Sequence, residues 1–204
     1  MTAHSTIYVD DLIDRFVEHV NSSEREPKCL DDLPTWLRVG PPDDDSVADE
    51  RAYYDWQIRR AERTEWIDAL GTRLPFPFPP SFQSLVRRYA YPDFTVGPLW
   101  LLANTGQPLY HEMSEGILGD GHLSRTLMEH GYLQFARPDT GGYDPVCFDT
   151  RRKSEGGEYP IVRIDHEAIL CYDHIGNVEE LAPSFLAFVR EVVEKAEFAA
   201  RVKP

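Results

Sequence analysis

The sequence predicts an α+β fold: a mixed, largely antiparallel β-sheet flanked by helices, with an N-terminal helical extension. Three observations lead to this class. Apolar residues recur at helical spacing near both ends of the chain, and they alternate with polar residues in the stretch between. Glycine pairs and proline-rich segments separate these stretches. Strands in the middle of a chain with helices at both ends favour a sheet that is covered by helices.

The chain has 204 residues, which favours one structural unit with additions. Within it, we expect residues 1–47 to form a helix and an irregular extension, and residues 48–204 to form the α+β domain. The first helix is expected over residues 8–20, where apolar side chains share one face: Leu12, Ile13, Phe16, Val17 and Val20. Prolines and glycine then interrupt regular structure up to residue 47, apart from a short turn at residues 33–37.

A second helix is expected over residues 48–70, followed by Gly71 as a plausible C-terminal cap. The pattern behind it is a set of residues at helical steps: Tyr53, Trp56, Arg60, Arg63, Ile67 and Leu70. A third, short amphipathic helix should cover residues 81–91, directly after the paired prolines Pro79 and Pro80.

From Phe94 onward the hydrophobic period changes to that of strands. We expect strands at residues 99–102, 132–135, 146–149, 159–165 and 167–172, with one helix at residues 123–130 that Gly131 would end. The last element is a helix that starts near Pro183, a residue that suits the first helical position. Its apolar face would contain Phe185, Phe188, Val189, Val192, Val193 and Ala196.

The charge balance is the strongest global feature. The chain has 35 acidic and 21 basic residues and a formal net charge of −14. A surface of this sign repels phosphate backbones and anionic lipids, which argues against nucleic acid and membrane as direct partners. It attracts basic proteins, although acidity alone also keeps a protein dispersed in solution.

The three cysteines do not form a disulfide framework by number, and the first 20 residues lack the basic and apolar regions of a secretory signal. The longest strongly apolar uncharged run is far shorter than a membrane span. These features predict a cytoplasmic protein.

Residues 143–170 gather a cysteine, a histidine and several carboxylates and therefore resemble an active site at first sight. Cys147 and His166 could act as a thiol nucleophile and its base. However, neither a glycine-lined turn nor a helix N-terminus adjoins Cys147 to lower its pKa. In an extended segment Asp165 and Glu167 would also lie on the face opposite His166. We therefore interpret Cys147 as structural and His166 as half-buried, with no catalytic residues in this segment.

Metal and cofactor sites are not predicted either. Cys147 and His166 could be combined with Cys171 and His174, but their spacing matches no zinc motif. No phosphate-binding loop is present in the sequence. The remaining candidates are acidic side chains that could contact a basic partner, and we assign them to partner binding: Asp43, Asp44, Asp45, Asp49, Glu50, Asp165 and Glu167.

Six phrases occur in a characteristic order: WIDALG, FPPSFQSLVRRY, GYLQFA, YDPVCFDT, GEYPIVRIDHEAIL and LAPSFLAFV. Together they resemble the SUKH superfamily of Smi/Knr cell-wall-regulator-like proteins over about residues 50–200. The resemblance implies scaffold roles for Leu74-Pro75 or Pro79-Pro80, Phe82, Phe135, Phe148, Asp149 and Phe185. Residues 1–47, the proline-rich segment at 76–80 and Tyr91-Pro92-Asp93 depart from the family pattern, and we expect specificity for a partner to reside there.

Bacterial members of this family are mostly immunity proteins of toxin systems, with no catalytic set. The resemblance therefore implies a protein that binds and neutralises a cognate toxin, such as a basic nuclease domain, by non-covalent occlusion. Two alternatives remain open. One is a small thiol-dependent hydrolase that uses Cys147 and His166, and the other is a regulatory interaction module without a toxin partner. The sequence does not determine the oligomeric state.

Overall fold

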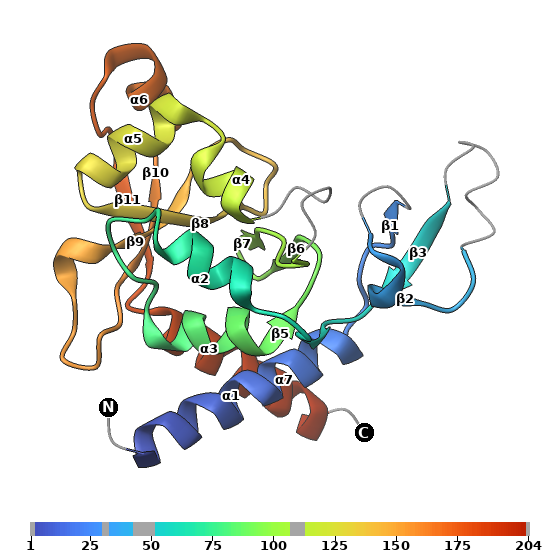
Figure 1. Cartoon of the computed structure of the whole chain (residues 1–204). Helices are drawn as coiled ribbons and strands as arrows, with labels where there is room; N and C mark the ends of the chain where they lie inside the picture. Colours follow the sequence, from blue (N-terminus) through green and yellow to red (C-terminus); the bar gives the residue numbers. More distant parts are fainter. Residues whose placement is uncertain (1–2, 30–32, 43–51, 107–112, 203–204) are drawn as a thin grey trace.

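The computed structural model describes residues 3–29, 33–42, 52–106 and 113–202 (Figure 1). The predicted α+β class is confirmed: antiparallel sheets are flanked by helices, and a helix begins the chain. The largest sheet has six strands in the order β11-β10-β9-β8-β7-β6, so strands that follow one another in the sequence lie side by side. Its strands are β6 (Phe94–Val96), β7 (Leu99–Leu101), β8 (Tyr132–Pro138), β9 (Val146–Asp149), β10 (Ile161–Ile164) and β11 (Val178–Ala182).

Helices pack on both faces of this sheet. The helices of the described residues are α1 (Ala3–Ser22), α2 (Glu65–Gly71), α3 (Pro80–Arg88), α4 (Met113–Leu118), α5 (Gly121–Glu129), α6 (His166–Tyr172) and α7 (Phe185–Val202). The same residues also form the short 3-10 helices η2 (Thr35–Leu37) and η4 (Thr150–Arg152). α3 and α7 contribute to the main core on one face, and α1 packs against both of them. α5 and α6 cover the β9–β10 half of the other face (Figure 1).

The centre of the main core is a group of phenylalanine rings. Phe82 of α3 contacts four other rings edge-on, with ring centroids 5.1–5.3 Å apart: Phe78, Phe135, Phe148 and Phe185. Phe135 and Phe148 are neighbours on β8 and β9 and stack at 3.9 Å. Edge-to-face aromatic pairs stabilise a core beyond the free energy of burial alone. The group therefore joins α3 and α7 to the middle of the sheet.

The N-terminus of α3 is held by a distant carboxylate. Pro80 occupies the first turn, and Glu158 accepts hydrogen bonds from the Ser81 N–H at 2.8 Å and the Ser81 hydroxyl at 2.7 Å. A carboxylate at this position satisfies a backbone donor that has no partner within the helix. The loop before β10 is thereby fixed to the helix that carries Phe82.

A second, three-stranded sheet projects from the side of the molecule (Figure 1). Its order is β1-β3-β2, from β1 (Lys28–Cys29), β2 (Arg38–Val39) and β3 (Tyr53–Trp56). The expected boundary at residue 47 thus falls between two strands of one sheet. Trp56 at the end of β3 is buried against Phe94, at 5.6 Å between ring centroids, so this small sheet is joined to the main core.

The helix predicted over residues 48–70 is wrong apart from its last turns. Residues 53–56 form β3, and residues 59–60 form β4 (Arg59–Arg60), which pairs with β5 (Tyr89–Ala90). Of the part of this range that the structure describes, from residue 52 onward, only residues 65–71 are helical. The aromatic residues Tyr53, Tyr54 and Trp56 fit a pleated surface well, and pairing partners distant in sequence outweighed the local helical spacing.

The strand predicted at residues 167–172 is also wrong, because β10 ends at Ile164 and α6 begins at His166. Asp165 is the N-cap: its side chain accepts a hydrogen bond from the Glu167 N–H at 2.9 Å. Such a cap satisfies one of the donors that every helix start leaves open, and it favours a helix where alternation predicted a strand. Ala168 and Ile169 face the sheet as a result.

The other predicted elements are present, with ends that differ by at most six residues. The expected helices at residues 8–20, 81–91 and 123–130 correspond to α1, α3 and α5, and the C-terminal helix is α7. The turn at residues 33–37 is η2, although the flanking two-residue strands β1 and β2 were not expected. The strands at residues 99–102, 132–135, 146–149 and 159–165 correspond to β7, β8, β9 and β10.

Asp149 at the end of β9 is a buried carboxylate held by two arginines. It accepts hydrogen bonds from Arg151 Nε at 2.8 Å and Arg152 Nε at 2.9 Å. Burial tends to raise the pKa of this carboxyl, but the hydrogen bonds and positive charges of Arg151 and Arg152 outweigh burial and hold it below its ordinary value.

The variant Asp149→Asn should therefore unfold with a free energy lower by about 1–3 kcal/mol at pH 7. A depressed folded-state pKa stabilises the fold above the unfolded carboxyl pKa of about 3.9, and this contribution disappears as pH falls through the folded value. Urea unfolding between pH 3 and 7 should show the two proteins converging below about pH 4. Asp11→Asn at an exposed position is the control. A difference that persists unchanged at pH 3 would contradict the assignment.

Candidate functional site: a cleft on the second face of the sheet

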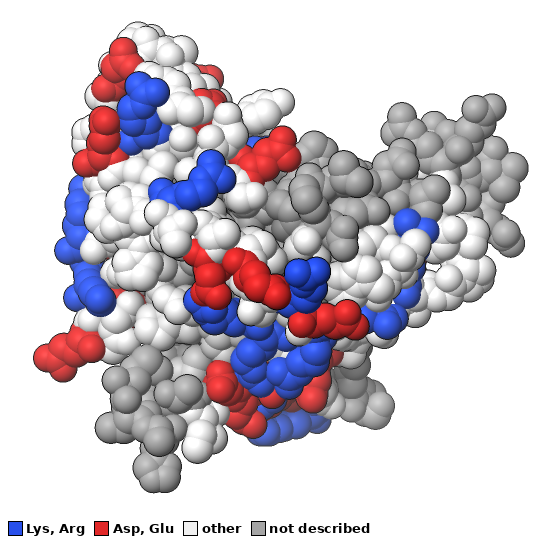
Figure 2. Space-filling model, in the orientation of Figure 1, with Lys and Arg blue, Asp and Glu red and all other residues white. Residues whose placement is uncertain are grey.

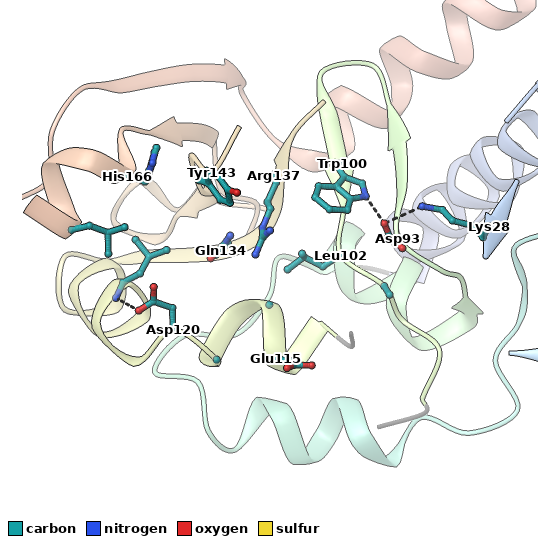
Figure 3. Close-up of a pocket in the computed structure, with 15 residues that line it drawn as sticks. Lys28, Asp93, Trp100, Leu102, Glu115, Asp120, Gln134, Arg137, Tyr143 and His166 are labelled. Carbon is teal, nitrogen blue, oxygen red and sulfur yellow. Dashed lines mark hydrogen bonds and ion pairs between the residues drawn. The ribbon is translucent and has the colours of Figure 1, made fainter. Parts of the chain in front are cut away.

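A cleft of about 850 Å³ lies on the sheet face opposite α3 and α7. Its walls come from β7 and β8, from α4, from the start of α5 and from α6, and Lys28 of the small sheet closes one end. Figure 3 shows Gln134, Arg137 and Leu102 between Trp100 on one side and His166 on the other. α5 and α6 cover the neighbouring part of this face, so the cleft occupies the part that they leave open.

A bulge in β8 places two polar residues on the cleft side. Gln134 pairs with Cys147 and Ala136 pairs with Val146, so Phe135 is an extra residue on β8. Phe135 and Ala136 both face the main core, and Arg137, paired with Trp100, returns to the face of Gln134. Without the bulge, strict alternation would have put Arg137 on the opposite face from Gln134.

Trp100 connects the charged groups at one end of the cleft. Its indole N–H donates to Asp93 Oδ2 at 2.7 Å, and the same oxygen accepts from Lys28 Nζ at 3.0 Å. The Arg137 guanidinium lies over the indole ring, 5.7 Å from its centroid. Cation–π contacts of this kind orient a guanidinium without neutralising it.

Arg137 and Gln134 are two polar groups of the cleft with unused hydrogen-bonding capacity. Within the described residues, Arg137 forms no ion pair with a carboxylate. The side chain of Gln134 is only 5% exposed, and Nε2 makes one long hydrogen bond of 3.4 Å to the Ala136 carbonyl. Its Oε1 accepts no hydrogen bond from any described part of the chain. Oε1 is not one of the fully buried oxygens that lack a partner, so it is accessible from the cleft, where a polar ligand could donate a hydrogen bond to it.

The other end of the cleft joins the loop before β9 to α6. Asp144 Oδ1 accepts from the His166 backbone N–H at 3.1 Å and lies 2.7 Å from His166 Nδ1. Partial burial raises the pKa of Asp144, but the hydrogen bonds from His166 prevail and keep it below its ordinary value. The ring of Tyr143 lies 5.8 Å from that of His166. This arrangement places Tyr143 at the rim of the cleft, next to the anchored Asp144.

The prediction that His166 is half-buried is confirmed. The prediction that Asp165 and His166 lie on opposite faces of a strand is wrong. The atoms of Asp144, Asp165 and His166 that could bind a metal ion lie within 4.8 Å of one another, the one such group among the described residues. β10 ends at Ile164, so Asp165 and His166 do not continue the alternation of the strand, and their side chains lie close together. The carboxylate of Asp144 is already used by His166 and that of Asp165 caps α6, so their hydrogen bonds account for the cluster as a joint between loop and helix.

Cys147 lies on β9, in a small apolar cluster beneath α5 and α6, and is fully buried. Burial and the nearby charge of Asp149 raise the pKa of its thiol well above the ordinary value. A thiol in this state is protonated at neutral pH and out of reach of a substrate. The geometry thus disfavours the hydrolase reading based on Cys147 and His166.

Iodoacetamide at pH 7.5 should therefore modify Cys171, which is exposed, and leave Cys147 unmodified in the folded protein. We expect Cys147 to react on the order of 100-fold more slowly, because reaction requires local opening of the sheet. Peptide mapping by mass spectrometry gives both rates from one sample, with Cys171 as the internal control. Faster labelling of Cys147 than of Cys171 would restore the thiol nucleophile.

The acidic residues assigned to partner binding lie in two places. Asp43, Asp44, Asp45, Asp49 and Glu50 lie outside the described residues. Asp165 and Glu167 lie at the start of α6, where Asp165 is the cap and Glu167 is exposed. Neither lines the cleft.

Sequence reasoning singled out regions that contain five of the cleft residues. Tyr143, His166 and Leu170 fall within the segment first considered, and Lys28 and Asp93 fall within regions expected to determine partner specificity. The other lining residues were missed. Trp100 was expected only as part of the strand at residues 99–102. Gln134 and Arg137 reach one face of β8 through a bulge, which a pattern of alternating residues does not reveal. One available signal was Arg137, the single charged residue of the segment YLQFARP.

The visible face of the molecule carries charges of both signs (Figure 2). Basic and acidic side chains interleave across its lower part, and ion pairs such as Arg87–Asp68, Arg88–Asp14 and Arg60–Asp14 join α1 and α2 to α3 and β4. The described acidic side chains on this face therefore do not form one continuous negative patch.

Comparison with protein-family models gave no match, and no curated protein matches the sequence significantly. The resemblance to the SUKH superfamily consequently rests on the six sequence phrases alone. Among the described residues, no helix combines the length and apolar character that a membrane crossing requires.

Proposed function

We propose that this protein is an immunity protein, which binds a cognate toxin domain through the cleft and blocks it without covalent chemistry or a cofactor. The observation that carries the proposal is the apolar rim of the cleft. Tyr143 is 71% exposed and Leu170 is 47% exposed, and both line the cleft. Large apolar side chains around a hollow that also contains polar groups are typical of a protein-binding surface.

The rim is also held in place before a partner arrives. The chain next to Tyr143 is anchored by the hydrogen bonds between Asp144 and His166, and Leu170 lies on a helix whose other face buries Ala168 and Ile169. Side chains that are already ordered lose less conformational entropy on binding, so more of the contact free energy contributes to affinity.

The charge of the protein supports a basic partner. A net charge of −14 would accelerate association with a basic toxin domain by about 10- to 10³-fold at low salt. Acidic side chains outside the cleft, including Glu167 beside the rim, would contribute to this long-range attraction. The cleft would then supply the short-range contacts that determine which partner is accepted.

The proposal places the protein in the cytoplasm of the cell that makes the toxin. The free thiols of Cys29, Cys147 and Cys171 are compatible with a reducing compartment. The resemblance to the SUKH superfamily supports the same role, because its bacterial members are mostly immunity proteins.

The test is co-production of this protein with the toxin domain encoded beside it. We expect it to restore growth of cells that make the toxin, and the two purified proteins to elute together on gel filtration. Because steering is electrostatic, the association rate should fall as the salt concentration rises. Unrelieved toxicity together with separate elution would refute the proposal. A stable complex that leaves toxicity unchanged would favour the regulatory module instead.

A further inference from the structure

The cleft contains one positively charged side chain, Arg137, whose charge is not paired with a carboxylate of the described residues. Arg137 is half-buried and lies over Trp100, and no carboxylate among the described residues pairs with it. Beside it, Oε1 of Gln134 accepts no hydrogen bond within the described residues and is accessible from the cleft. Both groups line the cleft, and Figure 3 shows them next to each other at its centre.

We propose that the cleft recognises a single carboxylate next to an apolar group, and that the partner supplies both from one peptide segment. The carboxylate would belong to an aspartate or glutamate residue or to the C-terminus of the partner. This inference rests on the proposed function, since it names the chemistry of the partner at the same cleft.

The shape of the two polar groups favours a carboxylate. A guanidinium presents parallel N–H donors that match the two oxygens of a carboxylate, and such charge-assisted pairs are stronger than neutral hydrogen bonds. The indole of Trp100 supports the guanidinium from one side. Oε1 of Gln134 can accept a hydrogen bond from a peptide N–H of the ligand. In a peptide, such an N–H lies next to the carboxylate.

The charges around the cleft favour one negative charge over two. Two cationic side chains, Lys28 and Arg137, line it together with three carboxylates, Asp93, Glu115 and Asp120. Asp93 already pairs with Lys28, which leaves the Arg137 charge for a ligand. A phosphate group with nearly two charges would be repelled by the remaining carboxylates more strongly than a carboxylate would.

The walls of the cleft provide for the apolar group. Leu102, Leu123 and Leu170 line it together with Trp100 and Tyr143. Burial of an aromatic or aliphatic side chain against these residues contributes apolar contact area, whereas Arg137 and Gln134 fix the orientation of the ligand.

The test uses three small probes and the ¹H–¹⁵N spectrum of the full-length protein. N-acetyl-L-phenylalanine carries a carboxylate beside an aromatic ring, its amide lacks the charge, and phenyl phosphate replaces the carboxylate. The indole N–H of Trp100 is the reporter, because it donates to Asp93 inside the cleft. We expect the acid to shift this signal saturably, with an affinity at least about tenfold higher than that of the amide and higher than that of phenyl phosphate. The indole signals of Trp36, Trp56 and Trp66 should stay in place.

Matched arginine variants assign the effect to one side chain. Arg137→Gln should abolish the preference for the acid over the amide, and Arg137→Lys should retain only part of it because the planar pair of donors is lost. Arg125→Gln on α5 removes the same charge from an exposed position that does not line the cleft, and it should leave the preference unchanged. The dispersion of each spectrum reports whether the variant is folded.

Several results would overturn the inference: no saturable shift of the Trp100 signal with the acid, equal binding of acid and amide, tighter binding of phenyl phosphate, or equal loss in the Arg137→Gln and Arg125→Gln variants.

The experiments also separate a failure of this inference from a failure of the proposed immunity function. If the acid binds as expected and no toxin is neutralised, the cleft chemistry stands and the immunity role fails. If the toxin complex forms equally well with Arg137→Gln, the immunity role stands and this inference fails.

Discussion

Replacement of Phe82 by alanine should lower the free energy of unfolding by about 3–5 kcal/mol, which is the size expected for a large aromatic residue removed from a well-packed core. Phe82 is fully buried and meets four other phenylalanine rings, which come from β8, β9, α7 and the loop before α3. Those rings belong to elements that fix one another, so the surrounding side chains cannot collapse fully into the space that the variant leaves.

Urea unfolding followed by circular dichroism measures this change. Phe198→Ala is the matched control, because Phe198 is 69% exposed near the end of α7 and its removal should change the free energy by no more than about 0.5 kcal/mol. The variant Phe82→Leu should lie between the two. A loss below about 1 kcal/mol for Phe82→Ala would show that the aromatic group is not the centre of the core.

Replacement of Leu170 by arginine should weaken binding of the toxin domain by at least about 30-fold, the effect of losing one interface hot spot. Leu170 lines the cleft and is already partly exposed, so the change should leave the fold intact. A long charged side chain at this position would fill the cleft, and its charge would have to be desolvated when a partner docks.

Isothermal titration calorimetry with the purified toxin domain gives the affinity. Phe198→Arg introduces the same side chain on α7, which packs on the opposite face of the sheet, and should bind like the natural protein. Equal weakening by both variants would attribute the effect to net charge and would remove the cleft from the interface.

The long amphipathic helices and the central strands were predictable because their determinants are local. α1 and α7 each present an uninterrupted apolar face, and β8 and β9 alternate until the bulge. Hydrophobic spacing of this kind depends only on near neighbours in the sequence. The same local rule failed at residues 53–60, where the partners of β3 are residues 28–29 and 38–39 and no local pattern identifies them.

The helix α6 was missed although the sequence contains its signal. Asp165 followed by Glu167 in the first turn is typical of a helix start, but the alternation of Val162, Ile164 and His166 suggested that the strand continued. One N-cap hydrogen bond decided between the two patterns.

The cleft could not be predicted because its residues meet only through long-range packing. Lys28 and Asp93 are 65 residues apart, and Arg137 reaches the cleft only through the bulge at Phe135. The bond between Glu158 and Ser81, which are 77 residues apart, has the same character. The composition of the chain predicts a highly charged surface. The position of the candidate site depends on which distant residues the tertiary fold brings together.

The central claim is that the cleft is the surface through which this protein neutralises a toxin. Its most direct test is the growth of cells that produce the toxin domain together with the natural protein, Leu170→Arg or Phe198→Arg, at equal levels of folded protein. We predict that the natural protein and Phe198→Arg restore growth and that Leu170→Arg does not. Equal protection by Leu170→Arg, or no protection by the natural protein, would contradict the account.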